Sequence, residues 1–208
     1  MGVEMNPVTK RIAVIASGRG SNFQAVIDVI AAGKIPAACV ALITDNPKAY
    51  AIQRAKKAGI PVIVVDYASF PSRDEYERAL LAAMQRVSPD LVILAGYMRI
   101  VGPEIVQAFP GRMMNIHPAL LPSFTGLHAQ RQAAHHGVKV SGCTVHFVDE
   151  TLDGGPIILQ CSVPVLDDDD EDSLADRILK QEHKCFPEAI RLFCEGRLVI
   201  EGRKVRIR

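Results

Sequence analysis

Residues 11–33 read RIAVIASGRGSNFQAVIDVIAAG, and this stretch decides the fold class. Its opening, Arg11 to Ala16, is mainly apolar and β-branched, which predicts a buried strand. Glycines at 18 and 20 then break the strand. Ser21 with Gln24 three residues later forms a capping-box pattern, and apolar residues follow at helical spacing until Gly33. The stretch therefore predicts a strand, a glycine loop and a helix, in that order.

The same rhythm continues along the first half of the chain. Apolar strands are predicted at 38–43, 62–65 and 91–95, with a helix at 49–58 between the first two. Another helix is opened by a second capping box, in which Ser72 precedes Glu75. Strands that alternate with helices indicate βαβ units. We expect a single-domain α/β fold with a Rossmann-like open sheet that is parallel in its N-terminal half.

The second half is less regular. Strands are predicted at 140–148 and 157–165, close enough in sequence to pair antiparallel, so the sheet should be mixed here. The remaining elements expected are a strand at 112–117, helices at 127–136 and 173–193, and a terminal hairpin at 197–200 and 204–207. We divide the chain into a flexible leader, 1–10, and one domain, 11–208, with halves at 11–110 and 111–208.

Composition excludes several classes of protein. A net charge of +1 over 208 residues gives no electrostatic reason to bind nucleic acid or an acidic membrane surface. The longest apolar stretches, such as 37–43, are too short to span a bilayer. Scattered cysteines without a C-x-x-C pair argue against a zinc cluster and fit reduced thiols in the cytoplasm. They are Cys39, Cys143, Cys161, Cys185 and Cys194.

The glycine loop indicates an anion site. Gly18 and Gly20 begin a dinucleotide fingerprint, but Phe23 stands at the third glycine, although Asp45 supplies a candidate for the acidic residue that follows such a loop. A Walker loop is excluded because no Gly-Lys-Ser/Thr follows. What remains is a set of backbone N–H groups at a helix N-terminus, suited to one phosphate. A tight turn without a ligand is the alternative.

Two further pieces carry polar groups suited to acyl chemistry. On a strand ending at Pro118, Asn115 and His117 share one face, at the carboxyl edge where open α/β sheets bind ligands. An amide donor and an imidazole suit an oxyanion that forms at a carbonyl. Asp153, in the loop before Gly154-Gly155, can orient and stabilise a protonated histidine. The alternatives are structural: satisfied polar residues at a strand end, and an aspartate that makes a turn.

In this order and spacing, the pieces resemble the folate-dependent formyltransferase family, and within it the phosphoribosylglycinamide formyltransferases. The resemblance covers residues 11–199, so 11–208 is expected to be a formyltransferase domain. It rests on IASGRGSN at 15–22, LAGYMRI at 94–100, NIHPALLP at 115–122, and HFV at 146–148 running on to DGGP at 153–156.

The resemblance implies transfer of the formyl group of N10-formyltetrahydrofolate to the amine of 5'-phosphoribosylglycinamide, in purine (IMP) biosynthesis. The formyl-folate is a co-substrate, and no metal is expected. The catalytic residues implied are Asn115, His117 and Asp153. The substrate phosphate and ribose would contact Gly20, Ser21, Asn22 and Glu182. The folate would contact Arg73, Leu94, Met98, Arg99, Ile100, Val101, Val148, Asp149, Glu150, Thr151 and Leu152.

Two positions depart from the family. Gln130 stands where some relatives carry a second histidine, and Leu179 where relatives place a polar or basic side chain. The departures leave the central trio intact but put Gln130 in doubt as a site residue and reduce the expected phosphate contacts. By resemblance to bacterial relatives, a homodimer is also expected.

Three rival functions remain at this point. A formyltetrahydrofolate deformylase would use water as the acceptor, but such relatives carry a regulatory domain before this core. A tRNA-directed formyltransferase would carry a further C-terminal domain and a basic surface. A non-catalytic nucleotide-binding module would not need Asn115, His117 and Asp153 together.

Overall fold

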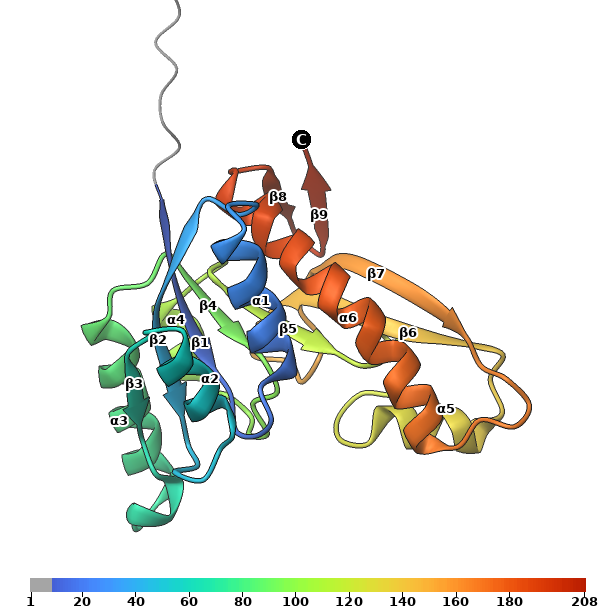
Figure 1. Cartoon of the computed structure of the whole chain (residues 1–208), viewed down its shortest axis with the longest axis horizontal. Coiled ribbons are helices and arrows are strands. Elements are labelled where there is room, and N and C mark those ends of the chain that lie inside the picture. The colour runs from blue at the N-terminus through green and yellow to red at the C-terminus, as the bar shows by residue number, and fades with distance from the viewer. Residues whose placement is uncertain (1–8) are drawn as a thin grey trace, which may run out of the picture.

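The computed structural model describes residues 9–208, which form a nine-stranded sheet with helices on both faces (Figure 1). The predicted leader falls mostly outside this range, and its last residue, Lys10, belongs to the first strand. The strands are β1 (Lys10–Ile15), β2 (Ala37–Thr44), β3 (Val62–Val64), β4 (Leu91–Leu94), β5 (Met113–His117), β6 (Val140–Phe147), β7 (Ile157–Pro164), β8 (Leu198–Glu201) and β9 (Lys204–Ile207). The helices are α1 (Ser21–Ala31), α2 (Ala51–Lys57), α3 (Arg73–Arg86), α4 (Pro103–Ala108), α5 (Ala129–His136) and α6 (Glu171–Cys194), with a 3-10 turn at Tyr67–Ser69.

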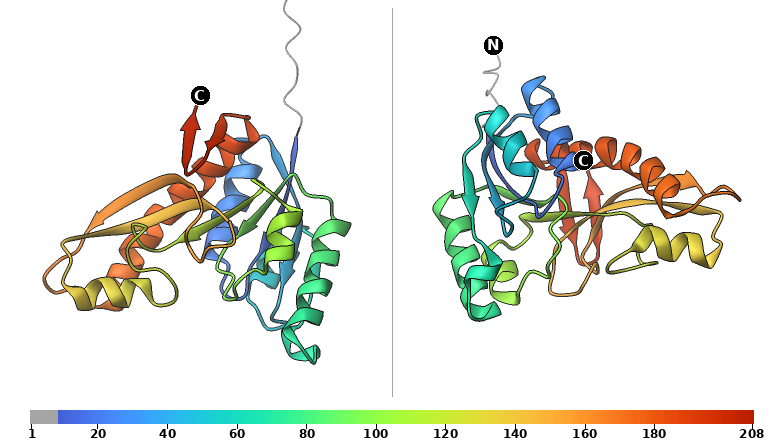
Figure 2. Two further views of the ribbon diagram at one scale, coloured as in Figure 1. Left: turned by 180° about the vertical axis from the view of Figure 1, so that it is seen from behind. Right: turned by 60° about the horizontal axis from the view of Figure 1, so that its bottom comes forward.

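The parallel half of the sheet runs β3-β2-β1-β4-β5, and its central strands β1 and β4 are buried on both faces. In β1, Ile12 and Val14 join the core cluster that includes α1, α2 and α6, whereas Ile15 packs into a second cluster with α3 and α4. Figure 1 shows α1, α2 and α6 over one face, and the view from behind in Figure 2 shows α3 and α4 over the other. Burial of both faces explains why these strands lack polar alternation.

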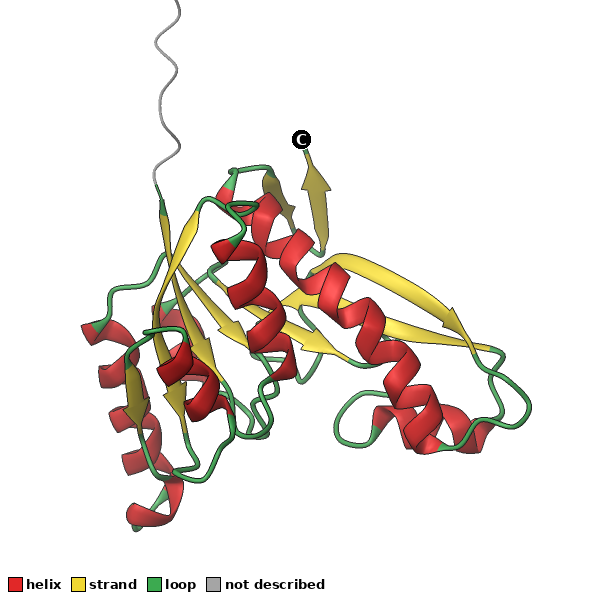
Figure 3. Cartoon of the chain, in the orientation of Figure 1, coloured by secondary structure: helices red, strands yellow, loops and turns green. Residues whose placement is uncertain are grey.

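The other half of the sheet is mixed, as the sequence predicts. β6 pairs antiparallel with β5 and with β7, β9 joins β7 in parallel, and the hairpin β8–β9 closes the sheet edge. Figure 3 shows β6 and β7 reaching away from the parallel part alongside α6. This extension carries α5 at its far end, next to α6.

Strand order reverses between β1 and β4, and the loops that follow these two strands are bonded to each other. The Ser17 amide donates to the Gly96 carbonyl at 3.1 Å, and the Met98 amide donates to Ser17 Oγ at 3.1 Å. A crevice at such a switch point is where open α/β sheets bind ligands. The fold thus places the glycine loop beside residues 95–101.

One predicted helix start is wrong. Gly20, not Ser21, is the N-cap of α1; it has φ +66°, and no side chain caps the helix. Gln24 instead bonds Asp28. A Cβ at Gly20 would lie 2.8 Å from the Ala51 Cβ, so α2 packs too closely for a larger residue there. The first-turn N–H groups therefore keep no side-chain acceptor, which suits them to an external anion.

Other elements differ less from prediction. Ser72 caps α3, since its Oγ accepts from the Glu75 amide at 3.2 Å. Helix α6 begins two residues earlier than predicted because Asp170 and Ser173 form a capping box. The short α4 was not predicted. Within residues 9–208, no helix is both long and apolar enough to cross a membrane.

Candidate active site

Strand β5 presents two polar side chains at its carboxyl end. Met114 and Ile116 point into the core cluster, so Asn115 and His117 lie on the opposite face, as alternation predicts. His117 is buried and Asn115 is half-buried. Pairing of β5 with β6 fixes both positions, and pairing with β4 also reaches Asn115.

His117 is held between a loop carbonyl and a carboxylate. Its Nε2 lies 2.8 Å from the Phe124 carbonyl, and because a carbonyl only accepts, this nitrogen donates. Its Nδ1 lies 3.5 Å from Asp153 Oδ2, close enough for an ion pair when the ring is protonated. Both ring nitrogens thus face oxygen atoms.

Asp153 reaches this position through an irregular loop between β6 and β7. The residue itself has φ +50°, and its Oδ2 accepts the Gly126 amide at 2.7 Å. A Cβ at Gly155 would lie 1.9 Å from the Phe147 carbonyl, so only glycine lets the loop pass this close to β6. The double glycine therefore turns the carboxylate toward His117.

His146 is a member of this cluster that the sequence reasoning missed. It faces Asn115 across the β5–β6 ladder, and its Nε2 lies 3.1 Å from Asn115 Nδ2. Its Nδ1 bonds the Phe147 carbonyl at 2.9 Å, so Nδ1 carries the proton and Nε2 accepts from the amide. Burial lowers the pKa of His146, in keeping with this neutral form. Its presence in the HFV stretch and its strand position were the only signals.

The predicted phosphate and ribose residues lie at the start of α1 and on α6. Asn22 Nδ2 donates to Glu182 Oε2 at 2.7 Å, and both side chains are buried. Asn22 Oδ1 is buried and has no hydrogen-bond partner. Burial raises the pKa of Glu182, against the lowering effect of the Asn22 bond. A buried polar pair with one unpartnered acceptor, Asn22 Oδ1, thus lies on the first turn of α1 and on α6.

Most of the predicted folate residues lie on two loops, one after β4 and one after β6. Met98, Ile100 and Leu152 are large apolar side chains exposed by more than half. Arg73, Met98, Arg99 and Ile100 line a cavity of about 220 Å³. Leu94 ends β4, and Val101 and Val148 pack against the cluster around α3 and α4. Exposed apolar groups beside arginines suit a flat ring system with an acidic tail.

Several of the predicted folate residues form hydrogen bonds or ion pairs within the protein. Arg73 pairs with Glu77 at 2.6 Å. Glu150 accepts from Gln107, and Asp149 accepts from the Thr151 amide. A larger hollow, about 360 Å³, lies around Phe109 and Arg112 before β5, away from these groups.

Asp45, the candidate ribose-binding acid of a dinucleotide site, is bonded to Arg99 instead. Arg99 Nε lies 2.7 Å from Asp45 Oδ2, and the guanidinium carbon lies 3.4 Å from the centre of the Tyr67 ring. These contacts fix Arg99 in the lining of the cavity of about 220 Å³. The carboxylate is therefore committed to positioning an arginine.

Comparison with known proteins identifies the family of this chain. The family model described as formyl transferase matches residues 10–190. This chain belongs to the formyl transferase family. It is 44% identical over 187 residues to the phosphoribosylglycinamide formyltransferase of Escherichia coli (strain K12), covering 90% of this chain and 88% of that protein.

Two further relatives are a solved structure and a longer protein. A crystal structure of glycinamide ribonucleotide transformylase 1 from Symbiobacterium toebii superposes with a TM-score of 0.95 at 52% identity, covering 100% of this chain and 98% of that one. The trifunctional purine biosynthetic protein adenosine-3 of Drosophila melanogaster is 48% identical over 193 residues, 92% of this chain. This chain spans only 14% of the length of that longer protein.

Proposed function

We propose that this protein transfers the formyl group of N10-formyltetrahydrofolate to the amine of 5'-phosphoribosylglycinamide in purine biosynthesis. The observation that carries the proposal is the approach of Asp153 to His117, beside Asn115. These residues lie at the carboxyl end of β5, between two different binding regions. One region offers free N–H groups and buried polar atoms; the other offers exposed apolar side chains and arginines. These match a phosphorylated acceptor and a folate donor.

The acceptor occupies the region at the start of α1. Its phosphate binds the N–H groups that follow Gly20, together with Ser21 and Asn22, and its ribose hydroxyls bond Glu182. The donor lies across the loops after β4 and β6, its ring against Met98, Ile100 and Leu152. Arg73 takes the glutamate carboxylate once it leaves Glu77. The two substrates then meet at Asn115 and His117.

The reaction proceeds through a tetrahedral intermediate. The acceptor nitrogen attacks the formyl carbon, and negative charge grows on the formyl oxygen. One Asn115 N–H is bonded to His146, which leaves the second N–H for that oxygen. Protonated His117 supplies the other stabilising charge, and Asp153 stabilises His117. The bond from carbon to N10 then breaks as the amine proton passes, with the help of a water and Asp153, to N10.

Phe124 must release His117 for this step. The Nε2 proton is directed at the Phe124 carbonyl, so it can reach the formyl oxygen only after the segment around Phe124 shifts. Catalytic hydrogen bonds commonly tighten only when the substrates are bound.

A folate-release assay tests the proposal. Purified protein is mixed with the formyl-folate donor alone, with donor and phosphoribosylglycinamide, and with donor and the dephosphorylated acceptor. We expect folate release that depends on the phosphorylated acceptor. Release at equal rate without any acceptor would mean that water is used and that the enzyme is a deformylase. No release by folded protein would reject both activities in favour of a binding module.

A cytoplasmic location and a homodimer, both expected from the sequence, stay predictions. Gel filtration with light scattering measures the second directly.

A further inference from the structure

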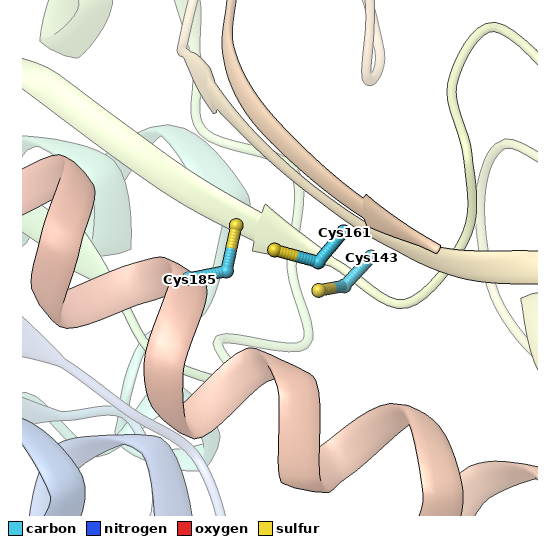
Figure 4. Close-up of side chains that lie close together, drawn as sticks. All are labelled: Cys143, Cys161 and Cys185. Atoms are coloured by element: carbon cyan, nitrogen blue, oxygen red, sulfur yellow. The ribbon is translucent and has the colours of Figure 1, made fainter. Parts of the chain in front are cut away.

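Three of the five cysteines meet between the sheet and α6. Cys143 of β6 lies opposite Cys161 of β7 in the strand register, and α6 brings Cys185 over them. Their sulfur atoms all lie within 4.8 Å of one another (Figure 4). The sequence argued against a metal cluster because these residues are far apart in the chain; the fold removes that separation.

The spacing is close to that of a metal thiolate site. A Zn–S bond is about 2.3 Å, so two thiolates on one tetrahedral ion lie roughly 3.8 Å apart. Sulfurs within 4.8 Å reach this geometry by side-chain shifts of about 1 Å or less. Because the ligands are three thiols from three elements, soft cations such as Zn²⁺ are favoured over Mg²⁺ or Ca²⁺.

The surroundings give the site one open side. Cys143 and Cys185 are buried, whereas Cys161 is only partly covered. An ion can therefore enter past Cys161, and a water can complete its coordination there.

A thiol must lose its proton to bind a metal ion, so a site made of thiols should bind its ion more tightly as pH is raised.

We propose that Cys143, Cys161 and Cys185 form a binding site for one soft divalent cation of the Zn²⁺ class, separate from the reaction centre. The ion joins α6 to β6 and β7. Glu182 lies one turn before Cys185 on α6, so the ion also stabilises the helix that carries the acceptor-side carboxylate.

Cadmium titration of the reduced protein provides the test, since thiolate-to-Cd²⁺ charge transfer absorbs in the near ultraviolet. We expect saturation at one Cd²⁺ per chain, loss of the band when Zn²⁺ competes, and a higher Tm with either ion. Half-saturation should shift to lower Cd²⁺ concentration as pH is raised.

Cysteine variants locate the ion. Cys161→Ser should weaken Cd²⁺ binding at least 100-fold, and because this side chain is partly exposed the variant should fold. Cys39→Ser, at an equally half-buried cysteine outside the cluster, and Cys194→Ser, on the same helix, should bind as the parent does. Failure of the reduced parent protein to show a saturable band would overturn the site. So would unchanged binding by folded Cys161→Ser, or equal loss in Cys39→Ser.

Discussion

The proposed acceptor region and the proposed reaction centre differ in how tightly their groups are joined. In the acceptor region, Asn22 and Glu182 form a buried 2.7 Å hydrogen bond. In the reaction centre, Asp153 lies 3.5 Å from His117 and 3.9 Å from His146, and His117 is bonded to a loop carbonyl. Under the proposed function, the groups that bind the acceptor are already in place, whereas the groups that react are drawn together by substrate, so binding energy completes the catalytic geometry.

The largest expected effect tests the reaction centre through its carboxylate. Asp153→Asn keeps an oxygen for the Gly126 amide, so the fold should survive. It removes the negative charge beside His117, and kcat should fall about 10³-fold with little change in KM. Steady-state kinetics measure this, with Asp172→Asn, at an exposed aspartate, as the control. A fall of less than about tenfold would remove Asp153 from the mechanism.

Asn115→Ala should have the next largest effect. It removes the amide donor aimed at the oxyanion, which typically costs roughly 10²–10³ in kcat. Because the amide acts in the transition state, KM for both substrates should stay close to the parent value. Gln85→Ala, on α3, removes an exposed amide and serves as the matched control. A rise in KM with unchanged kcat would make Asn115 a binding residue instead.

Glu182→Gln tests the proposed acceptor region. Here KM, rather than kcat, should change most. Loss of a charged hydrogen bond of about 1.5–3 kcal/mol should raise KM for the ribonucleotide roughly 10- to 100-fold, with a smaller change in kcat. An equal effect on both KM and kcat would erase the contrast between the two regions.

The same variant should be more stable than the parent above neutral pH. Burial raises the pKa of Glu182 above its ordinary value of 4.5. As pH rises from 4.5 through the raised pKa of the folded protein, ionising this buried carboxylate therefore lowers the free energy of unfolding. Glutamine removes this cost, so the Tm gain should be present at pH 8 and shrink toward pH 4. Glu188→Gln is a control whose change in Tm should have the opposite sign, because the bond to Arg191 lowers the pKa of Glu188.

The smallest expected effect concerns His146, which positions Asn115. His146→Gln should lower kcat roughly fivefold, the effect of losing one neutral hydrogen bond of about 1 kcal/mol.

The same variant should change the pH dependence of stability. Burial lowers the pKa of His146, so in the parent protein the unfolded chain binds the proton first and stability falls as pH drops below 6.5. Thermal melts from pH 7.5 to 5 should show a weaker acid loss in the variant than in His135→Gln, an exposed control. Identical melting profiles would contradict this.

Local patterns predicted the parallel half of the fold closely. Strand β4 and helix α3 were found to within a residue or two because apolar runs and a serine cap are signals carried by neighbouring residues. The prediction at Ser21 was wrong because its pattern with Gln24 is also local, whereas Gly20 packs closely against α2, a segment some thirty residues away. Helix α4 spans only six residues, too few for a periodic signal.

The site was predictable only in part, because several of its contacts depend on distant segments. Shared strand geometry predicted that Asn115 and His117 would lie together. The contact of His146 with Asn115 depends on the β5–β6 register, and the cysteine cluster depends on how α6 crosses β6 and β7. Neither is recorded in the spacing along the chain. The engagement of Asp45 by Arg99 is similarly non-local.

Under the proposed function, the carbonyl of Phe124 limits loss of the formyl group to water. While this carbonyl accepts the Nε2 proton of His117, a formyl group beside the ring meets no free Nε2–H donor. A stray water molecule then has little help in cleaving the donor. The activated one-carbon unit is kept until this short segment moves aside.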